Sequence, residues 1–101
     1  MVRFAALARD DLLEIARYIA RDNPARARSF VVELRDQCDL LAKHPGIGVA
    51  RSEYGEGLRM LPHGRYLNFF SIIAQDVLIE RVLHSARDVN ALFTPGEDSS
   101  G

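Results

Sequence analysis

The stretch RVLHSARDV, residues 81–89, carries the side chains with the clearest chemical potential in this sequence, namely Arg81, His84 and Arg87. They follow directly after a run of β-branched and aliphatic residues that is typical of a strand. A histidine can exchange protons near neutral pH, and an arginine can bind phosphate or carboxylate oxygens through two parallel hydrogen bonds. Such a group could serve a ribonuclease or a recognition surface, or it could be the ordinary end of a strand.

Two further arginines, Arg59 and Arg65, precede this stretch. If the segments that carry the arginines are consecutive antiparallel strands, we expect the strand ends to meet at one edge of a sheet. The net charge there is small, because residues 58–88 contain four arginines against three acids. An arginine-lined groove could bind an acidic protein segment as readily as RNA. Alternatively, the arginines are solvated or weakly paired with nearby acids.

The three histidines, His44, His63 and His84, do not show the spacing of a metal site. They lie in separate loops or strand ends, without the short repeats that bring ligands to one face of an element. We therefore expect no metal ion and no cofactor.

Carboxylates and the cysteine have simpler explanations than catalysis. Asp10, Asp11 and Glu14 lie near the start of a predicted helix, where the helix dipole favours negative charge. Cys38 falls on the apolar stripe of a second predicted helix, so we expect it to be buried and unreactive.

The composition indicates a single soluble domain. The chain has 101 residues, of which 48% are hydrophobic and 27% charged, and its one cysteine excludes an internal disulfide. No apolar run approaches the length of a membrane span and no signal peptide is apparent, so we expect a reducing cytoplasm. Thirteen basic and fourteen acidic residues give a net charge of −1. This balance argues against direct nucleic-acid binding, which depends on neutralising phosphates.

The first half of the chain predicts a short edge strand over residues 2–4 and a helical hairpin. Asn23 and Pro24 are typical of a helix start, and the segment KHPGIG after residue 42 predicts the end of that helix. Two apolar stripes with helical spacing mark the faces that must be buried: Leu12, Ile15, Ala16 and Ile19 in the first helix, and Ala27, Phe30, Val31, Leu34, Cys38 and Leu41 in the second.

The second half predicts a loop over residues 49–57 and then three strands, at 58–62, 65–73 and 77–84, with short links at 63–64 and 74–76. A short apolar stub follows, and residues 94–101 have the composition of a flexible tail. The predicted fold is α+β, in the order β-α-α-β-β-β, with the helical hairpin packed on a small twisted antiparallel sheet. Residues 1–93 form the domain.

Four segments, taken together, resemble the ParE branch of the RelE/ParE toxin superfamily: DLLEIARYIARDNPARA (11–27), LLAKHPGIGVARSE (40–53), LRMLPHGRYLNFFSI (58–72) and VLIERVLHSARDV (77–89). The resemblance implies the fold and a role as the toxin of a type II toxin–antitoxin pair. It also implies a ParD-like antitoxin with a ribbon-helix-helix head, whose C-terminal segment folds onto the toxin. ParE-like toxins are associated with poisoning DNA gyrase, whereas RelE-like toxins cleave mRNA on the ribosome.

The residues favour the gyrase branch. RelE-type cleavage relies on a strongly basic surface and commonly on a late tyrosine, whereas this chain has a single lysine and no tyrosine after Tyr66. Cleavage of a phosphodiester develops charge that must be stabilised from several sides, and we expect Arg81, His84 and Arg87 to be too few for this. The chain also departs from the family, because Ala5 stands where a Ser or Thr cap is usual and Phe70 where a tyrosine often stands.

We therefore expect a cytoplasmic toxin without catalytic residues, which forms a hetero-oligomer with its antitoxin and meets DNA only through that partner. The residues expected to contact the antitoxin or the target are Arg59, Arg65, Arg81, His84 and Arg87. The alternatives are a ribosome-dependent endoribonuclease of the RelE type and a toxin-derived scaffold that has lost toxicity.

Overall fold

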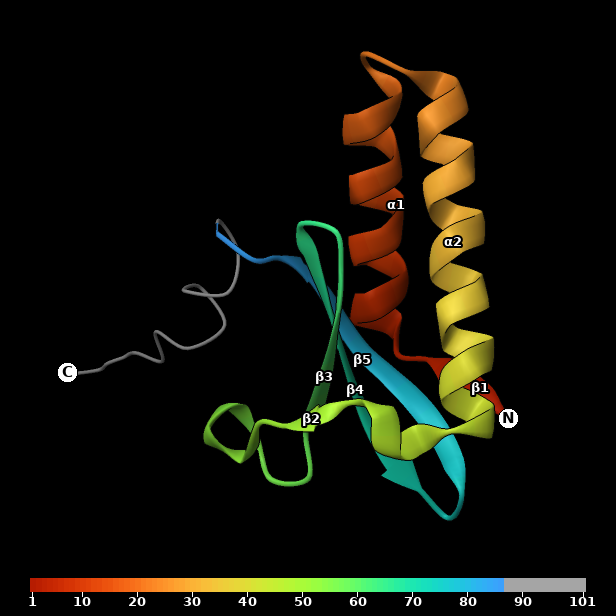
Figure 1. The fold of residues 1–101 in the computed structure, drawn as a ribbon. Coiled ribbons are helices and arrows are strands. Elements are labelled where there is room, and N and C mark those ends of the chain that lie inside the picture. The colour runs from red at the N-terminus through yellow and green to blue at the C-terminus, as the bar shows by residue number, and fades with distance from the viewer. Residues whose placement is uncertain (87–101) are drawn as a thin grey trace, which may run out of the picture.

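The computed structural model describes residues 1–86, which form two helices, five strands and two short 3-10 turns (Figure 1). The elements follow in the order β1 (Val2–Phe4), α1 (Ala6–Ala20), α2 (Pro24–Lys43), η1 (Pro45–Ile47), β2 (Val49–Ala50), η2 (Ser52–Tyr54), β3 (Arg59–His63), β4 (Tyr66–Ile73) and β5 (Asp76–His84). Arg87, the apolar stub and the predicted tail lie outside the described residues.

The strands form one sheet in the order β1-β5-β4-β3-β2. The meander of β3, β4 and β5 is antiparallel, as predicted. The sheet departs from the predicted antiparallel arrangement only at its edge strand, because β1 pairs with β5 in parallel and makes the sheet mixed. Parallel neighbours need a long connection, and here the helical hairpin and most of the sheet separate the two strands in sequence.

Two-residue turns join the strands of the meander, at Gly64–Arg65 and Ala74–Gln75. Gly64 has φ of 59°, which glycine adopts easily. Ala74 and Gln75 have φ of 50° and 74°, in the left-handed region that tight hairpin turns require and that side chains disfavour. The β4–β5 turn is therefore held in place by the long strand pairing on either side of it.

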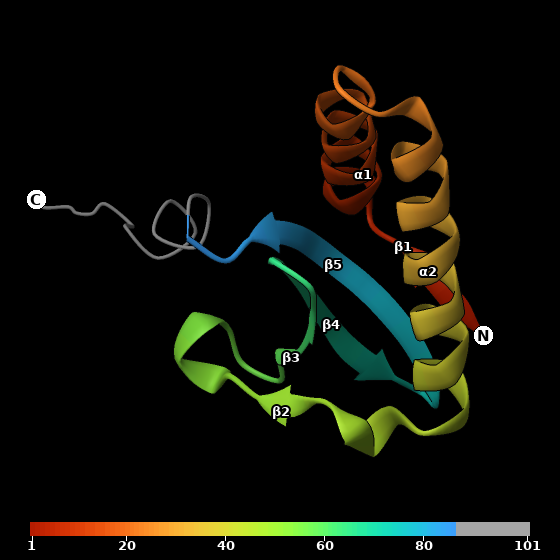
Figure 2. The ribbon, with the colours of Figure 1, turned by 45° about the horizontal axis from the view of Figure 1, so that its top comes forward.

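Both helices pack on the same face of the sheet (Figures 1 and 2). Asn23 caps α2 as predicted, since its side chain accepts a hydrogen bond of 3.0 Å from the backbone N–H of Arg26, and Pro24 is the first residue of the helix. The helix ends at Lys43, one residue before the His44-Pro45 bond. Ala5 precedes α1 and provides no side-chain cap.

The main core lies between the helical hairpin and the sheet. The predicted stripe of α2 is buried there except at Val31, whereas the predicted stripe of α1 is fully buried only at Ile15 and partly buried elsewhere. Ile15 of α1 and the apolar stripe of α2 pack against the helix-facing residues of β4 and β5. The largest fully buried members of this core are Leu34, Leu41, Phe70, Val77, Ile79 and Val82.

A second, smaller core lies on the opposite face of the sheet. The prediction of a plain loop over residues 49–57 was wrong in part, because this segment contains β2 and η2. Tyr54 and Leu58 pack against Met60, Phe69 and Leu83, and the ring centroids of Tyr54 and Phe69 are 5.9 Å apart. The central strands are apolar on both faces, so the outer face also needs cover, and the η2 segment supplies it.

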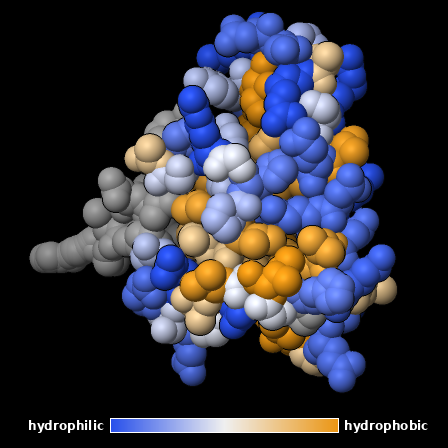
Figure 3. All heavy atoms as spheres, in the orientation of Figure 1, coloured by the Kyte–Doolittle hydropathy of each residue, from blue (hydrophilic) through white to orange (hydrophobic). Residues whose placement is uncertain are grey.

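Several hydrophobic side chains stay exposed where α2 ends and the chain turns towards the sheet edge. Leu40, Ile47 and Val49 are all exposed. Figure 3 shows hydrophobic residues gathered low on this side of the molecule and mostly hydrophilic ones over the upper part of the helices.

Gly48 is required by close packing. A Cβ atom at this position would lie 2.5 Å from Cζ of the buried Phe70 ring. We expect Gly48→Ala to lower the free energy of unfolding by roughly 1–3 kcal/mol, the usual cost of overfilling a packed core. Gly46→Ala is the matched control, because nothing lies within 4 Å of the new methyl group. Urea unfolding of the two variants checks this, and equal midpoints would contradict it.

Candidate functional site: polar contacts between helices and sheet

Arg81, the first residue of the RVLHSARDV stretch, forms a bidentate ion pair with Asp11 of α1. Its Nε and Nη2 atoms donate to the two carboxylate oxygens at 2.8 and 3.0 Å. The carboxylate also accepts a 3.0 Å hydrogen bond from the backbone N–H of Val82. Only 9% of the Asp11 surface is exposed. This contact fastens α1 to β5.

The assignment of Asp10, Asp11 and Glu14 to the helix dipole was wrong for Asp11. The first turn of α1 contains no acidic residue, and Asp11 points into the junction with β5. The sequence does carry a signal for this, because Asp11 lies three residues after Ala8 and four before Ile15, on the buried stripe. A carboxylate on an apolar stripe needs a buried partner.

Arg59 is also tied to the protein. Its Nη2 atom donates a hydrogen bond to the backbone carbonyl of Gly48, which holds the η1–β2 segment against β3. Its Nε atom is buried and, among residues 1–86, has no hydrogen-bond partner. One nitrogen of this guanidinium is therefore bound within the protein and another is buried, so the side chain is not fully presented to a ligand.

Arg65 and His84 come together at the far end of the sheet. Arg65 is exposed in the β3–β4 turn, and its carbonyl accepts a 2.8 Å hydrogen bond from the N–H of Ser85. His84 pairs with Tyr66 across the strands, and their rings meet edge to face with centroids 5.4 Å apart. The Nδ1 atom of His84 accepts the N–H of Ala86 at 3.2 Å.

The prediction that the arginines meet at one edge of the sheet was wrong for Arg59. Arg59 begins β3, whereas Arg65 lies just beyond the other end of that strand. Arg81 lies on β5, with the whole of β4 between it and Arg59. The structure thus brings Arg65 near His84 and keeps Arg59 apart from both. Arg87 lies outside the described residues, so its place among them stays a prediction.

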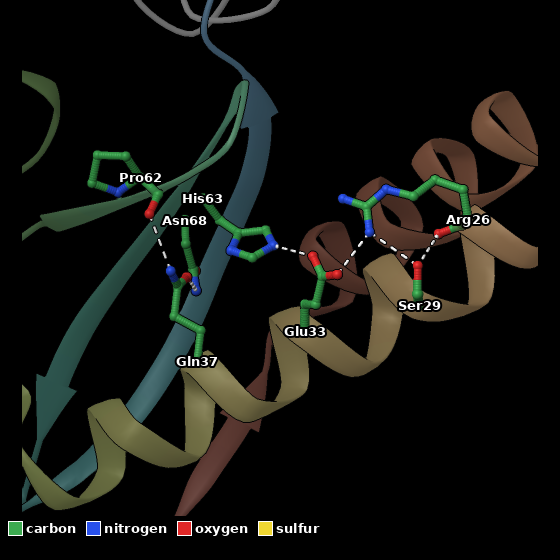
Figure 4. Close-up of polar contacts among 7 residues, drawn as sticks. All are labelled: Arg26, Ser29, Glu33, Gln37, Pro62, His63 and Asn68. Carbon is green, nitrogen blue, oxygen red and sulfur yellow. Dashed lines mark hydrogen bonds and ion pairs between the residues drawn. The ribbon is translucent and has the colours of Figure 1, made fainter.

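A polar ladder that the sequence did not reveal connects α2 to β3 (Figure 4). Glu33 accepts hydrogen bonds from Arg26 at 2.7 Å and from His63 at 3.1 Å. The hydrogen bond from Arg26 lowers the pKa of Glu33, and the contact with His63 adds to the effect. Phe30 lies against the His63 ring, with centroids 5.5 Å apart.

Gln37 extends the same ladder further along α2 (Figure 4). Its amide nitrogen donates to the carbonyl of Pro62 at 3.0 Å, and its oxygen accepts from Asn68 at 3.3 Å. Asn68, the third residue of β4, is fully buried. Its amide nitrogen is satisfied by Gln37, whereas its Oδ1 atom is buried and has no hydrogen-bond partner among residues 1–86.

Cys38 lies beside this amide and is buried, as predicted. Burial raises the pKa of its thiol to about 11. Among residues 1–86, no cluster of histidines, cysteines and acids has the arrangement of a metal site. In the same range, neither helix has the length and apolar character needed to cross a membrane.

A two-helix hairpin on a five-stranded mixed sheet is also the fold of a solved structure described as the chromosomal ParDE TA system from P. aeruginosa. The two chains superpose with a TM-score of 0.69 and are 21% identical, over 82% of this chain and 92% of that one. This likeness establishes the fold. A comparison with curated proteins finds no match.

The sequence itself shows the family. Residues 2–89 match the family described as ParE toxin of type II toxin-antitoxin system, parDE. The chain therefore belongs to the ParE toxin family. A member of this family is the toxin of a parDE pair, and this implies a ParD-type antitoxin as its partner.

Removing the Asp11 carboxylate should destabilise the protein markedly. Asp11→Ala leaves a half-buried guanidinium and the Val82 N–H without their acceptor, and we expect a loss of roughly 2–4 kcal/mol. Asp10→Ala removes an exposed carboxylate one residue away and should change stability by less than about 0.5 kcal/mol. Chemical denaturation measures both values. A loss for Asp11→Ala no larger than that of the control would refute the anchoring role.

The Cys38 thiol should resist modification in the folded protein. With a pKa of about 11, only about one thiol in a thousand is ionised at pH 8, and the thiolate is the reactive form. We expect a thiol reagent such as DTNB to label the native protein very slowly and the urea-unfolded protein within seconds to minutes. Rapid labelling of the native protein would show that the thiol is accessible.

Proposed function

We propose that this ParE toxin arrests growth by binding and poisoning DNA gyrase and has no catalytic residues of its own. We further propose that a ParD-like antitoxin neutralises it through a C-terminal segment that folds onto the toxin. The observation that carries the proposal is the family match over residues 2–89, since ParE toxins are associated with gyrase inhibition.

The engagement of the arginines supports binding over phosphate cleavage. A ribonuclease needs cationic groups directed at the phosphate to stabilise the charge of the transition state. Arg81 instead binds Asp11, and Arg59 binds the Gly48 carbonyl. The overall charge of −1 is also unfavourable for lodging in ribosomal RNA.

Arg59, Arg65, Arg81, His84 and Arg87 remain the residues that we propose for contact with the antitoxin or the target. Among those described, Arg65 is the best placed, because it is exposed in a turn at the end of the sheet. His84 is half-buried beside it. Arg59 and Arg81 would contribute mainly by holding the segments that form the contact surface.

Inducible expression with and without the neighbouring antitoxin gene tests this function. We expect growth arrest with an SOS response, relieved by the antitoxin, and inhibition of supercoiling when purified toxin is added to gyrase. Arg65→Glu should weaken gyrase inhibition, whereas Arg35→Glu, an exposed arginine on α2, should not.

Purified ribosomes translating an mRNA provide the contrasting assay. Intact transcripts are expected, and His84→Ala should leave them intact as well. If transcripts are cut within codons and this cutting is lost in His84→Ala, the protein is a RelE-type endoribonuclease and the proposal of gyrase binding is wrong. Unaffected growth together with tight antitoxin binding would identify a scaffold that has lost toxicity.

A further inference from the structure

The turn between α1 and α2, with the last turn of one helix and the first turn of the other, is a basic surface. These residues, 17–28, which we call the helical tip, contain four arginines and one aspartate, a net charge of +3. Since the whole chain has a net charge of −1, the other residues together carry −4. Figures 1 and 2 show the ends of both helices extending beyond the sheet. The helical tip is therefore a basic projection on an otherwise acidic protein.

The arginines of the helical tip are accessible. All four, Arg17, Arg21, Arg26 and Arg28, are exposed. Arg26 binds Glu33, which neutralises part of its charge. Within residues 1–86, the other three form no ion pair. Three guanidinium groups thus remain available to a ligand.

The stability of α2 does not explain the arginines at its start. A helix N-terminus is the positive end of the helix dipole, where acidic side chains are favourable and basic ones are not. The first turn of α2 contains Arg26 and no acidic residue, and Arg28 follows two positions later. Residues that break a local rule for stability are expected at functional sites. Here the dipole and the arginines add up to a positive potential that favours an anion.

A nucleic-acid backbone fits this surface better than a protein or a lipid bilayer. The centre of a protein interface and a helix that lies on a membrane both need apolar side chains. Among residues 17–28, Tyr18 is the one large hydrophobic side chain that is exposed. A phosphate backbone is bound mainly through charge, and arginine matches phosphate oxygens with two parallel hydrogen bonds. The helical tip contains no histidine, so it lacks an imidazole that could exchange protons during phosphate cleavage.

We propose that the helical tip binds the phosphate backbone of duplex DNA while the toxin is held on gyrase. Three phosphate contacts give only weak binding by themselves, but a second interface that holds the toxin beside DNA raises the effective concentration of the tip. The role of gyrase rests on the proposed function, whereas the DNA contact rests on the helical tip itself. This proposal differs from the expectation that DNA is met only through the antitoxin, because the net charge of the whole chain hides its uneven distribution.

Titration of a short fluorescent DNA duplex with the full-length toxin tests the contact directly. We expect the logarithm of the binding constant to fall with the logarithm of the salt concentration at a slope of roughly −3, for three neutralised phosphates. Arg21→Gln/Arg28→Gln removes one arginine from each helix and should raise the Kd by about tenfold or more at ~50 mM salt. Arg9→Gln/Arg35→Gln, also one exposed arginine from each helix but outside the tip, should leave the Kd within about threefold of wild type. Unfolding curves verify that both variants are folded.

A supercoiling assay with purified gyrase tests the contact where we propose that it acts. We expect half-inhibition by Arg21→Gln/Arg28→Gln to need about fivefold more toxin or more, and half-inhibition by Arg9→Gln/Arg35→Gln to need about as much as wild type.

Three results would overturn the proposal: a Kd for DNA that does not change in Arg21→Gln/Arg28→Gln, gyrase inhibition that does not change in this variant, or tighter binding of wild-type toxin to phosphatidylglycerol vesicles than to the duplex. Inhibition lost without a loss of DNA binding would show that the helical tip contacts gyrase itself, and this would also overturn the DNA contact. A wild-type toxin that binds the duplex but leaves gyrase active would instead contradict the proposed function and leave the DNA contact standing.

Discussion

The structure depends on how the exposed edge of β5 is closed. β5 has nine residues, but β1 pairs with only three of them. Beyond that point the backbone would present an unpaired edge beside the core. Asp11 closes it, because its carboxylate accepts the Val82 N–H and clamps the Arg81 guanidinium. Since α1 begins two residues after β1 ends, its second turn is brought to this edge, and the ion pair then sets how the helical hairpin lies on the sheet.

On the opposite side of the sheet, a helix side chain likewise forms a hydrogen bond with a strand that its short neighbour pairs with only in part. β2 pairs only with the first two residues of β3, and further along that strand Gln37 of α2 donates to the Pro62 carbonyl. α1 thus supplies Asp11 to the part of β5 that β1 does not pair with. In the same way, α2 supplies Gln37 to the part of β3 that β2 does not pair with. Between these two attachments the main core is apolar except for Asn68, whose amide is reached by the same Gln37. The hairpin is consequently held by polar contacts on either side of a hydrophobic centre.

Arg81 and Arg59 are poor guides to function because both form hydrogen bonds within the protein. Arg81 and Arg59 stabilise the junctions of β5 and β3 with the rest of the chain. The charges left for a partner are exposed ones that have no ion-pair partner among residues 1–86, at the β3–β4 turn and along α1. A toxin that acts by occupying another protein needs such a surface, whereas a nuclease needs convergent cations. The family match and the arrangement of these charges point in the same direction.

Local patterns in the sequence determined the helices, the meander and the helix-facing core, because helical spacing, the Asn23-Pro24 start and β-branched runs act over a few residues. The segment resemblance also identified the family. Only the tertiary structure decided the parallel pairing of β1, the second core under η2, and the partners of Arg81 and Glu33. Val2 pairs with a residue 75 positions later, Arg81 binds Asp11 from 70 positions away, and Glu33 and His63 are 30 positions apart, so no local pattern identifies these partners. The helical spacing of Asp11 indicates that its carboxylate is buried, but only the packing of the chain decides which group becomes its partner.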